Sequence, residues 1–179
     1  MSMKSYDYAH RKGVEEISWQ RFGELSRTLT EQLASKQIEI VIGVARAGLF
    51  PATAVACTLR RELYPVRVTR RVNDMVQYES PVWRVDVPAT VAGCRVAVID
   101  EIADSGETLS LVAARALERG ARRVWTVSLV SHSWANPQPD FTALTSDALV
   151  IFPWDKQVYT DGSWQLHPEI EAALHAQRR

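Results

Sequence analysis

Apolar residues along the chain fall into two alternating kinds of run. Short β-branched runs are apolar throughout, which is typical of strands buried on both faces of a sheet. Longer runs place an apolar residue at every third or fourth position, on one face of a helix. This alternation predicts an α/β fold, a mainly parallel sheet flanked by helices. The predicted strands are 38–45, 64–69, 96–99, 124–130 and 148–152, and the predicted helices are 18–34, 51–60, 107–119 and 168–177.

Cap residues mark the ends of several of these helices. Ser18 can cap the free amides of a first helical turn, and Ile17 can then pack on Phe22. Pro51 suits the first turn of the second helix. Gly120 is placed to end the third helix as a left-handed cap. The loops that remain between strands and helices are therefore short, apart from two segments.

Residues 1–17 and 70–93 interrupt the regular pattern. The first segment is expected to form an irregular N-terminal arm. The second is polar, mixed and broken by Pro81 and Pro88, which predicts a hairpin or a mobile flap, with a plain long connection as the alternative. The chain of 179 residues has no repeat, low-complexity tract or linker, so residues 1–179 are expected to form one domain.

Charge and cysteine content narrow the function classes. Lys plus Arg number 21 and Asp plus Glu number 21, which argues against strong attraction to nucleic acid or membranes. Cys57 and Cys94 lie among apolar residues, so buried free thiols are favoured over a disulfide. The N-terminus lacks the apolar core of a signal peptide, and no run approaches the roughly 18 apolar residues that span a bilayer. A soluble, cytoplasmic protein is expected.

The stretch from Val96 to Thr108 carries the most specific chemistry. Its apolar strand ends in Asp100 and Glu101, a turn follows, and the next helix is predicted to begin near Glu107. Free amides at a helix start attract an anion, and Gly106 lets a phosphate approach the backbone. Adjacent carboxylates suit ribose hydroxyls or Mg²⁺. The stretch therefore predicts a ligand that combines a diol, a metal and a phosphate.

The residues from Asp100 to Thr108 resemble the ribosyl-phosphate signature of type I phosphoribosyltransferases. That signature is an apolar strand, two acids, two apolar residues, an acid or small residue, and then Thr/Ser-Gly-x-Thr/Ser. The resemblance implies that Asp100 and Glu101 hold the ribose of 5-phosphoribosyl-1-pyrophosphate (PRPP), directly or through Mg²⁺. It implies that Asp104 acts as general acid/base on the nucleobase, with helix capping as the alternative. The implied 5′-phosphate loop also contains Ser105, Gly106, Glu107 and Thr108.

An upstream segment resembles the family's pyrophosphate loop. Arg46, Ala47 and Gly48 stand where relatives often have Arg-Gly-Gly after a strand. The resemblance implies that Arg46 and the neighbouring amides bind the leaving pyrophosphate, since a guanidinium makes forked bonds to phosphate. In relatives, this loop can hold a non-proline cis peptide bond.

Residues 147–155 are similar to the base-binding segment of xanthine–guanine phosphoribosyltransferases, which ends in Pro-Trp-Asp. The resemblance implies a type I phosphoribosyltransferase-like fold in which residues 131–179 form a hood. It assigns base binding to Val150, Trp154 and Asp155.

The same segment departs from the family pattern in two respects. Leu149 stands where those enzymes carry an aromatic that stacks on the base. His132 is the nearest counterpart of their lysine that reads the 6-oxo group, and it could donate to a carbonyl or be structural. These departures, with Ala47, leave catalytic competence open.

The resemblance implies a transferase of purine salvage that uses PRPP, Mg²⁺ and a nucleobase, with a 6-oxopurine favoured. It also implies a homo-oligomer, a dimer or tetramer. One alternative is a PRPP-binding regulatory protein with weak or no catalysis, and another is an enzyme for adenine or a pyrimidine. A kinase-like domain is less favoured, because the chain has no Gly-x-x-x-x-Gly-Lys loop.

Overall fold

The computed structural model describes residues 11, 13–69, 71–72, 75–78 and 81–177. The chain forms two compact units. The larger unit comprises Leu25–Thr145, and the smaller combines Met1–Glu24 with Ser146–Arg179.

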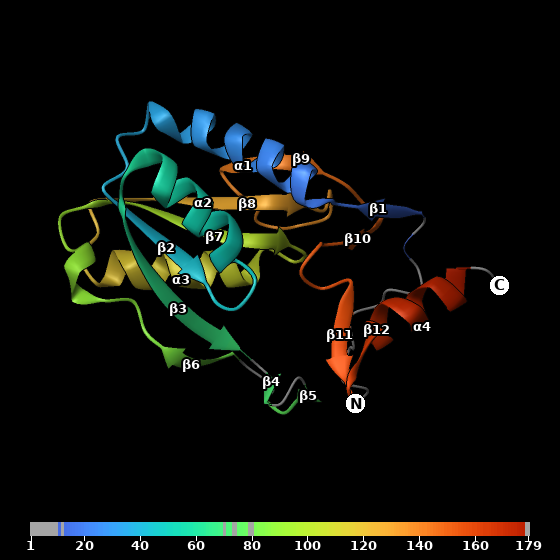
Figure 1. Cartoon of the computed structure of the whole chain (residues 1–179). Coiled ribbons are helices and arrows are strands. Elements are labelled where there is room, and N and C mark those ends of the chain that lie inside the picture. The colour runs from blue at the N-terminus through green and yellow to red at the C-terminus, as the bar shows by residue number, and fades with distance from the viewer. Residues whose placement is uncertain (1–10, 12, 70, 73–74, 79–80, 178–179) are drawn as a thin grey trace. The chain divides into compact units, whose positions relative to one another are not determined.

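A six-stranded sheet organises the larger unit, in the order β6-β3-β2-β7-β8-β9 (Figure 1). All neighbouring pairs are parallel except β3 and β6, which confirms the predicted α/β architecture. β2 is buried along its whole length, as its apolar run predicts. The strands are β2 (Ile40–Val44), β3 (Glu62–Thr69), β6 (Val82–Val85), β7 (Arg95–Ala103), β8 (Arg123–Ser131) and β9 (Phe141–Thr145).

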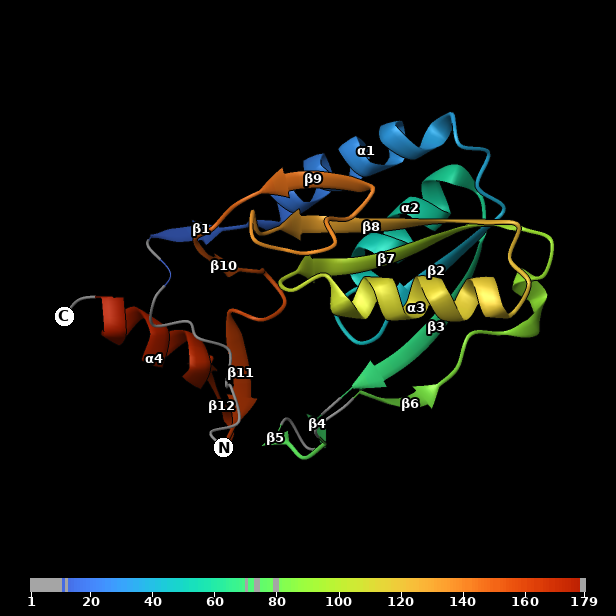
Figure 2. The same ribbon diagram turned by 180° about the vertical axis from the view of Figure 1, so that it is seen from behind.

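Helices cover both faces of this sheet. α2 (Leu49–Leu59) lies on one face and α3 (Glu107–Glu118) on the other, as Figures 1 and 2 show from opposite sides. Leu25, Leu29 and Leu33 of α1 (Trp19–Ala34) are buried, as their spacing predicts. Burial of such side chains supplies the main favourable free energy of folding.

The chain order creates a switch point between β2 and β7. From β2 the chain passes through α2 to β3 on one side, and it later returns to β7 on the other side of β2. Ligands of open parallel sheets bind beyond the carboxyl ends of strands at such a point. The loops after β2 and β7 are therefore the expected place for a site.

β7 is longer than predicted, and this changes the setting of the acidic pair. It continues beyond residue 99 to Ala103, because it stays paired with β8 at Asp100↔Ser128 and Ile102↔Val130. Asp100 and Glu101 thus belong to the strand, and only Asp104 to Gly106 form the turn. The acids are held by the sheet instead of by a loop.

The segment 70–93 divides into two parts. β4 (Arg71–Val72) and β5 (Met75–Val76) form an antiparallel hairpin, as one of the sequence alternatives predicts. Residues 70, 73–74 and 79–80 lie outside the described residues. The later part joins the body of the unit: β6 pairs with β3, the 3-10 helix Ala89–Val91 follows, and Val87 and Val91 are buried. A candidate flap is thereby confined to residues before β6.

The smaller unit contains elements that the apolar pattern did not predict. β1 (Val14–Glu16), within the expected arm, pairs in parallel with β10 (Leu149–Ile151), and β11 (Gln157–Thr160) forms a hairpin with β12 (Ser163–Leu166). α4 (Pro168–Gln177) matches its prediction. A small core joins β10 and α4 and contains Leu149, Ile151, Ile170 and Ala173.

Three further findings bear on the sequence predictions. Residues 131–145 belong to the larger unit, because β9 extends its sheet, so the smaller unit takes only the later part of the expected hood. Cys57 and Cys94 are free thiols as predicted, but neither is buried: Cys57 is exposed on α2 and Cys94 is partly exposed. Among the described residues, no helix is long and apolar enough to cross a membrane.

Candidate active site at the carboxyl edge of the sheet

Gly48 lies directly against Asp100. A Cβ atom at Gly48 would stand 2.5 Å from the Val44 carbonyl oxygen and 2.6 Å from Asp100 Oδ1. Real Cβ contacts are never so short, so only glycine lets the loop after β2 reach the acid on β7. The peptide bond between Ala45 and Arg46 in this loop is cis. The two segments that the sequence singles out therefore meet at the switch point.

The loop after β2 turns at once into α2. The amide of Leu49 donates to the Arg46 carbonyl, and the amide of Phe50 donates to the Ala47 carbonyl. Arg46 is exposed, whereas Gly48 is buried. The loop thus offers a cationic side chain to solvent beside a helix start, and such helix starts favour anions.

Asp100 is a buried carboxyl, with 8% of its surface exposed. Burial raises the pKa of Asp100 well above its ordinary value, and the neighbouring Glu101 carboxyl raises it further. The Glu101 amide donates to Asp100 Oδ1 at 2.9 Å, which opposes these effects only in part. A ligand that brings a cation or hydroxyl donors would compensate this buried charge.

The carboxyls of Asp100 and Glu101 suit one type of metal site. No group of three or more His, Cys, Asp or Glu that could hold a metal is found in the described ranges. Mg²⁺ is commonly bound by one or two carboxylates and completes its shell with water and substrate phosphates. The two acids therefore fit a Mg²⁺ that arrives with a phosphorylated substrate.

The turn before α3 is held by the loop that follows β8. Gly106 has φ +84°, and a Cβ there would collide with the carbonyl oxygen of Pro137. The Asn136 amide donates to the Ser105 carbonyl at 2.9 Å, and the Glu107 amide donates to Ser105 Oγ at 3.3 Å. The turn and the helix start are thus fixed in place before any ligand binds.

The remaining members of the predicted phosphate loop lie at this helix start. Gly106 is the N-cap of α3, so Asp104 does not occupy the capping position that was its alternative role. Thr108 lies in the first helical turn and is half-buried. The first amides of α3 have no partner within the helix, as at any helix start.

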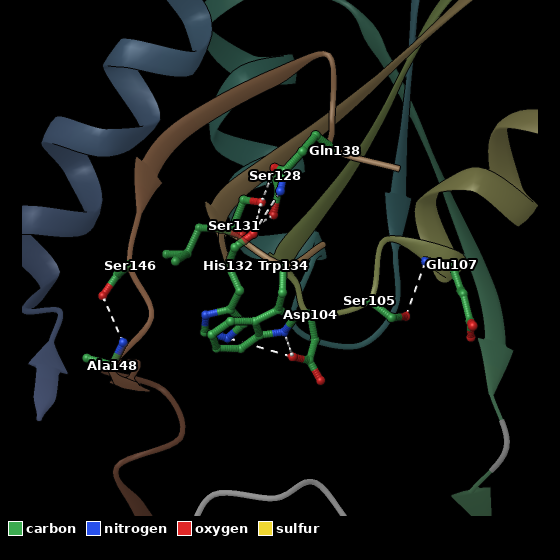
Figure 3. Close-up of polar contacts among 11 residues, drawn as sticks. Asp104, Ser105, Glu107, Ser128, Ser131, His132, Trp134, Gln138, Ser146 and Ala148 are labelled. Carbon is green, nitrogen blue, oxygen red and sulfur yellow. Dashed lines mark hydrogen bonds and ion pairs between the residues drawn. The ribbon is translucent and has the colours of Figure 1, made fainter. Parts of the chain in front are cut away.

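Asp104 lies beside two aromatic rings (Figure 3). The indole Nε1 of Trp134 donates to Asp104 Oδ1 at 3.2 Å, and His132 Nε2 lies 3.9 Å from the same oxygen. The rings of His132 and Trp134 stack with centroids 4.4 Å apart and planes inclined by 14°. The carboxyl, the imidazole and the indole thus form one cluster next to the phosphate-type turn.

The loop that carries these rings is tightly held. His132 is fully buried, and its amide donates to the Ala103 carbonyl at 3.1 Å. Gln138 anchors the loop: its Nε2 lies within hydrogen-bonding distance of the carbonyl oxygens of His132, Ser133 and Ala135, at 3.0, 3.1 and 2.9 Å. Such anchoring keeps the rings beside Asp104.

Other predicted base-binding residues belong to the smaller unit. Val150 is half-buried on β10, and Trp154 stacks on Phe152 with centroids 4.9 Å apart. Asp155 is exposed, and its Oδ1 lies 3.9 Å from Nε2 of His167. The role of these three residues in base binding stays a prediction.

Sequence reasoning missed Trp134, Pro137 and Gln138. Apolar residues in this loop follow no regular spacing. The sequence therefore does not distinguish a tryptophan at the site from one that packs in the core. One signal was available, because His132 and Trp134 directly follow a buried strand that ends at the carboxyl edge.

Known proteins similar to this chain in sequence or fold are named as phosphoribosyltransferases. Xanthine-guanine phosphoribosyltransferases are similar over most of the chain: that of Idiomarina loihiensis is 27% identical, covering 80% of this chain and 88% of its own. That of Cereibacter sphaeroides is 28% identical, covering 82% and 89%. The solved purine phosphoribosyltransferase of Pyrococcus horikoshii shares the fold, with a TM-score of 0.74, 24% identity and coverage of 84% and 99%.

A match to a protein-family model assigns the chain to the family that these similarities suggest. The model of the phosphoribosyl transferase domain matches residues 10–160, which include both loops of the candidate site. The predicted family, transferase class and fold are thereby confirmed. The chain belongs to the phosphoribosyltransferase family.

Proposed function

We propose that the chain transfers the 5-phosphoribosyl group of PRPP to a ring nitrogen of a 6-oxopurine, with release of pyrophosphate, as a step of purine salvage. The names of the similar proteins support guanine or xanthine as acceptor, and hypoxanthine is the third 6-oxopurine in the proposal. The contact between Gly48 and Asp100 carries the proposal. PRPP bears a pyrophosphate and a ribose diol on adjacent carbons, so one donor molecule can engage both loops.

The donor is bound at three points in this proposal. Arg46 and the amides of Ala47 and Gly48 hold the pyrophosphate. Asp100 and Glu101 hold the ribose hydroxyls, and Mg²⁺ at these acids would neutralise charge on the pyrophosphate as it leaves. The 5′-phosphate is held at the start of α3, by its free amides and the side chains of Ser105 and Thr108. Gly106 and Glu107 contribute backbone to this loop.

The bond from C1′ to pyrophosphate stretches as the reaction proceeds, and the ribose gains positive charge. Fixed groups that favour the separating charges accelerate such a step. Asp104 takes the proton that the acceptor ring nitrogen loses, and Trp134 and His132 hold its carboxyl for this purpose. The proposal keeps for Val150, Trp154 and Asp155 the base-binding role that the resemblance implies. It gives His132, which is fully buried, an indirect role through its contacts with Asp104 and Trp134.

Water must be kept away from the activated ribose, because it would hydrolyse the donor. The segment that begins with the β4–β5 hairpin is the proposed lid, since it follows β3 and precedes the part of the chain that packs into the core.

The decisive experiment incubates the chain with PRPP and Mg²⁺, offers guanine, xanthine, hypoxanthine, adenine and uracil in turn, and measures pyrophosphate release. Release that requires a 6-oxopurine supports the proposal. Release of pyrophosphate with adenine or uracil alone would reject a 6-oxopurine as the acceptor. Absence of release with every base would reject the proposed transfer reaction.

A second function is favoured by one observation. Leu149 is 1% exposed and belongs to a core, so it does not supply the aromatic that stacks on the base in the related enzymes. A PRPP-binding regulator without catalysis would tolerate this change. Both functions predict PRPP binding with Mg²⁺ in calorimetry, and only the enzyme releases pyrophosphate when a base is added. Binding without release with any base would therefore identify the regulator.

A further inference from the structure

A basic pocket lies at the end of the sheet where β7 and β8 begin, opposite the candidate active site. Figure 2 shows this end of the two strands. Its volume is about 360 Å³. It is bounded by the residues that follow α1, by the first residue of β7 and by the turn that leads into β8. Its lining includes Lys36, Gln37, Arg95, Arg122, Arg123 and Trp125.

Positive charge in this pocket is only partly balanced. Arg95 Nε pairs with Glu39 Oε2 at 3.2 Å. Within the part of the chain that the structure describes, no carboxylate lies within ion-pair distance of Lys36, Arg122 or Arg123. The Glu39 carboxylate also interacts electrostatically with Arg122, so one carboxylate faces several cations. The excess like charges repel one another, and a bound anion would relieve that repulsion.

Capping of helix ends is the alternative explanation for these cations, since α1 and α3 end at this edge and helix C-termini favour positive charge. Two contacts show that these side chains are directed to aromatic rings instead of to helix carbonyls. The guanidinium of Arg123 lies 4.8 Å from the centroid of the Trp125 ring, and Nζ of Lys36 lies 5.4 Å from that of Phe141. Aromatic rings thus hold both cations around the pocket.

We propose that this pocket binds a diphosphate group, either as inorganic pyrophosphate or as part of a nucleoside diphosphate. Lys36, Arg122 and Arg123 make no ion pair with a described carboxylate, and their charge matches a group that spreads its own charge over two phosphates. The guanidinium fork also suits phosphate oxygens. Trp125 is 7% exposed and offers little area for stacking a base, so recognition rests on the phosphates. This site is separate from the proposed donor site, because β7 begins at Arg95 and carries Asp100 toward its other end.

The test uses the full chain without Mg²⁺ and follows backbone amide signals by NMR during titration with inorganic pyrophosphate or adenosine diphosphate. Amides of residues 35–37, 95 and 122–123 report on the basic pocket, whereas those of residues 46–48 and 105–108 report on the donor site. We expect the first group to shift saturably with at least one of the two ligands. If the proposed function is wrong, only the amides of residues 46–48 and 105–108 should fail to respond, and the shifts at the basic pocket should remain.

Three variants sharpen the test. The double variant Arg122→Gln/Arg123→Gln should weaken binding at the pocket amides by about tenfold or more, since it removes two charge-assisted contacts. Glu39→Gln should tighten it, because it removes the carboxylate that pairs with Arg95. Arg27→Gln, an exposed change on α1 away from the pocket, should leave it unchanged.

Several results would overturn the inference. One is the absence of saturable shifts at the pocket amides with both ligands. Another is a loss of affinity in the double variant no larger than that in Arg27→Gln. Shifts produced by a long polyanion such as RNA, but by neither diphosphate, would identify a nucleic-acid surface instead and would equally reject a diphosphate site.

Discussion

The indole of Trp134 donates a hydrogen bond of 3.2 Å to the carboxyl of Asp104, across the gap between the loop after β8 and the turn before α3. Trp134 also stacks on His132, which is fully buried. The hydrogen bond from Trp134 therefore restricts the Asp104 carboxyl, and Trp134 is itself packed against the buried His132 ring. This makes Trp134 a positioning residue for the proposed general acid/base.

Trp134→Phe tests this role, because it keeps an aromatic ring on His132 while removing the N–H donor together with the second ring of the indole. We expect kcat to fall by about tenfold or more, since a hydrogen bond to a charged group contributes roughly 1.5–3 kcal/mol. The KM for PRPP should change by less than about twofold if the contact acts only on the catalytic step. Trp134→Ala should lose more activity, and a rise in KM with unchanged kcat would contradict the assignment.

Asp104→Asn tests the proton-transfer step directly. The amide can still accept from the Trp134 indole, but it cannot take a proton from the purine. Pyrophosphate release should fall by about a hundredfold or more, the usual scale for a general acid or base. Calorimetric binding of PRPP with Mg²⁺ should be retained. Full activity of this variant would remove Asp104 from the mechanism.

The parts of the fold that follow a simple period could be predicted from the sequence. β2, β7 and β8 are apolar runs buried on both faces, and α1 repeats leucine at Leu25, Leu29 and Leu33. The signature acids and the phosphate-type turn were located because strands of such a sheet end at a common edge. Here local pattern and overall fold agree.

Other parts depend on contacts that no local pattern encodes. β9 reads Phe-Thr-Ala-Leu-Thr and is only half-buried, so its place at the sheet edge follows from pairing with β8. β1 is too short to show a period, and its partner β10 lies far along the chain. The approach of Gly48 to Asp100 and that of Trp134 to Asp104 likewise join residues distant in sequence.

Gly48→Ala should damage the site through sterics alone. The new Cβ would meet the Val44 carbonyl, which is backbone and cannot swing away, as well as Asp100. Overpacking of this kind costs about 1–3 kcal/mol, and the displaced loop should lose PRPP binding. Urea unfolding and calorimetry measure the two effects.

Gly23→Ala is the matched control for this change. Gly23 lies within α1, and a Cβ there meets nothing within 4 Å. Alanine is the better helix former, so this variant should gain about 0.5–1 kcal/mol of stability. If Gly48→Ala unfolds at the same urea concentration as the unchanged protein, Gly48 is not tightly packed against Asp100.

Asp100→Asn should stabilise the protein in the absence of ligand. Because burial raises the pKa of Asp100, the folded state holds its proton more tightly than the unfolded state does. The unchanged protein therefore loses stability as pH rises above the ordinary range of an aspartate, and the variant escapes this loss. Its advantage in unfolding free energy should grow from acid to neutral pH, while binding of PRPP with Mg²⁺ is lost.

Asp86→Asn provides a control of opposite sign. A side-chain hydrogen bond from Arg119 is the main cause that lowers the pKa of Asp86, and Arg115 adds a second ion pair. Its carboxylate stabilises the fold above the ordinary range of an aspartate, and this contribution disappears as pH falls. Asp86→Asn should therefore lower stability at neutral pH and have little effect in acid. Urea unfolding at both pH values compares the variants, and a loss of stability in Asp100→Asn at neutral pH would show that the Asp100 carboxylate is already compensated within the fold.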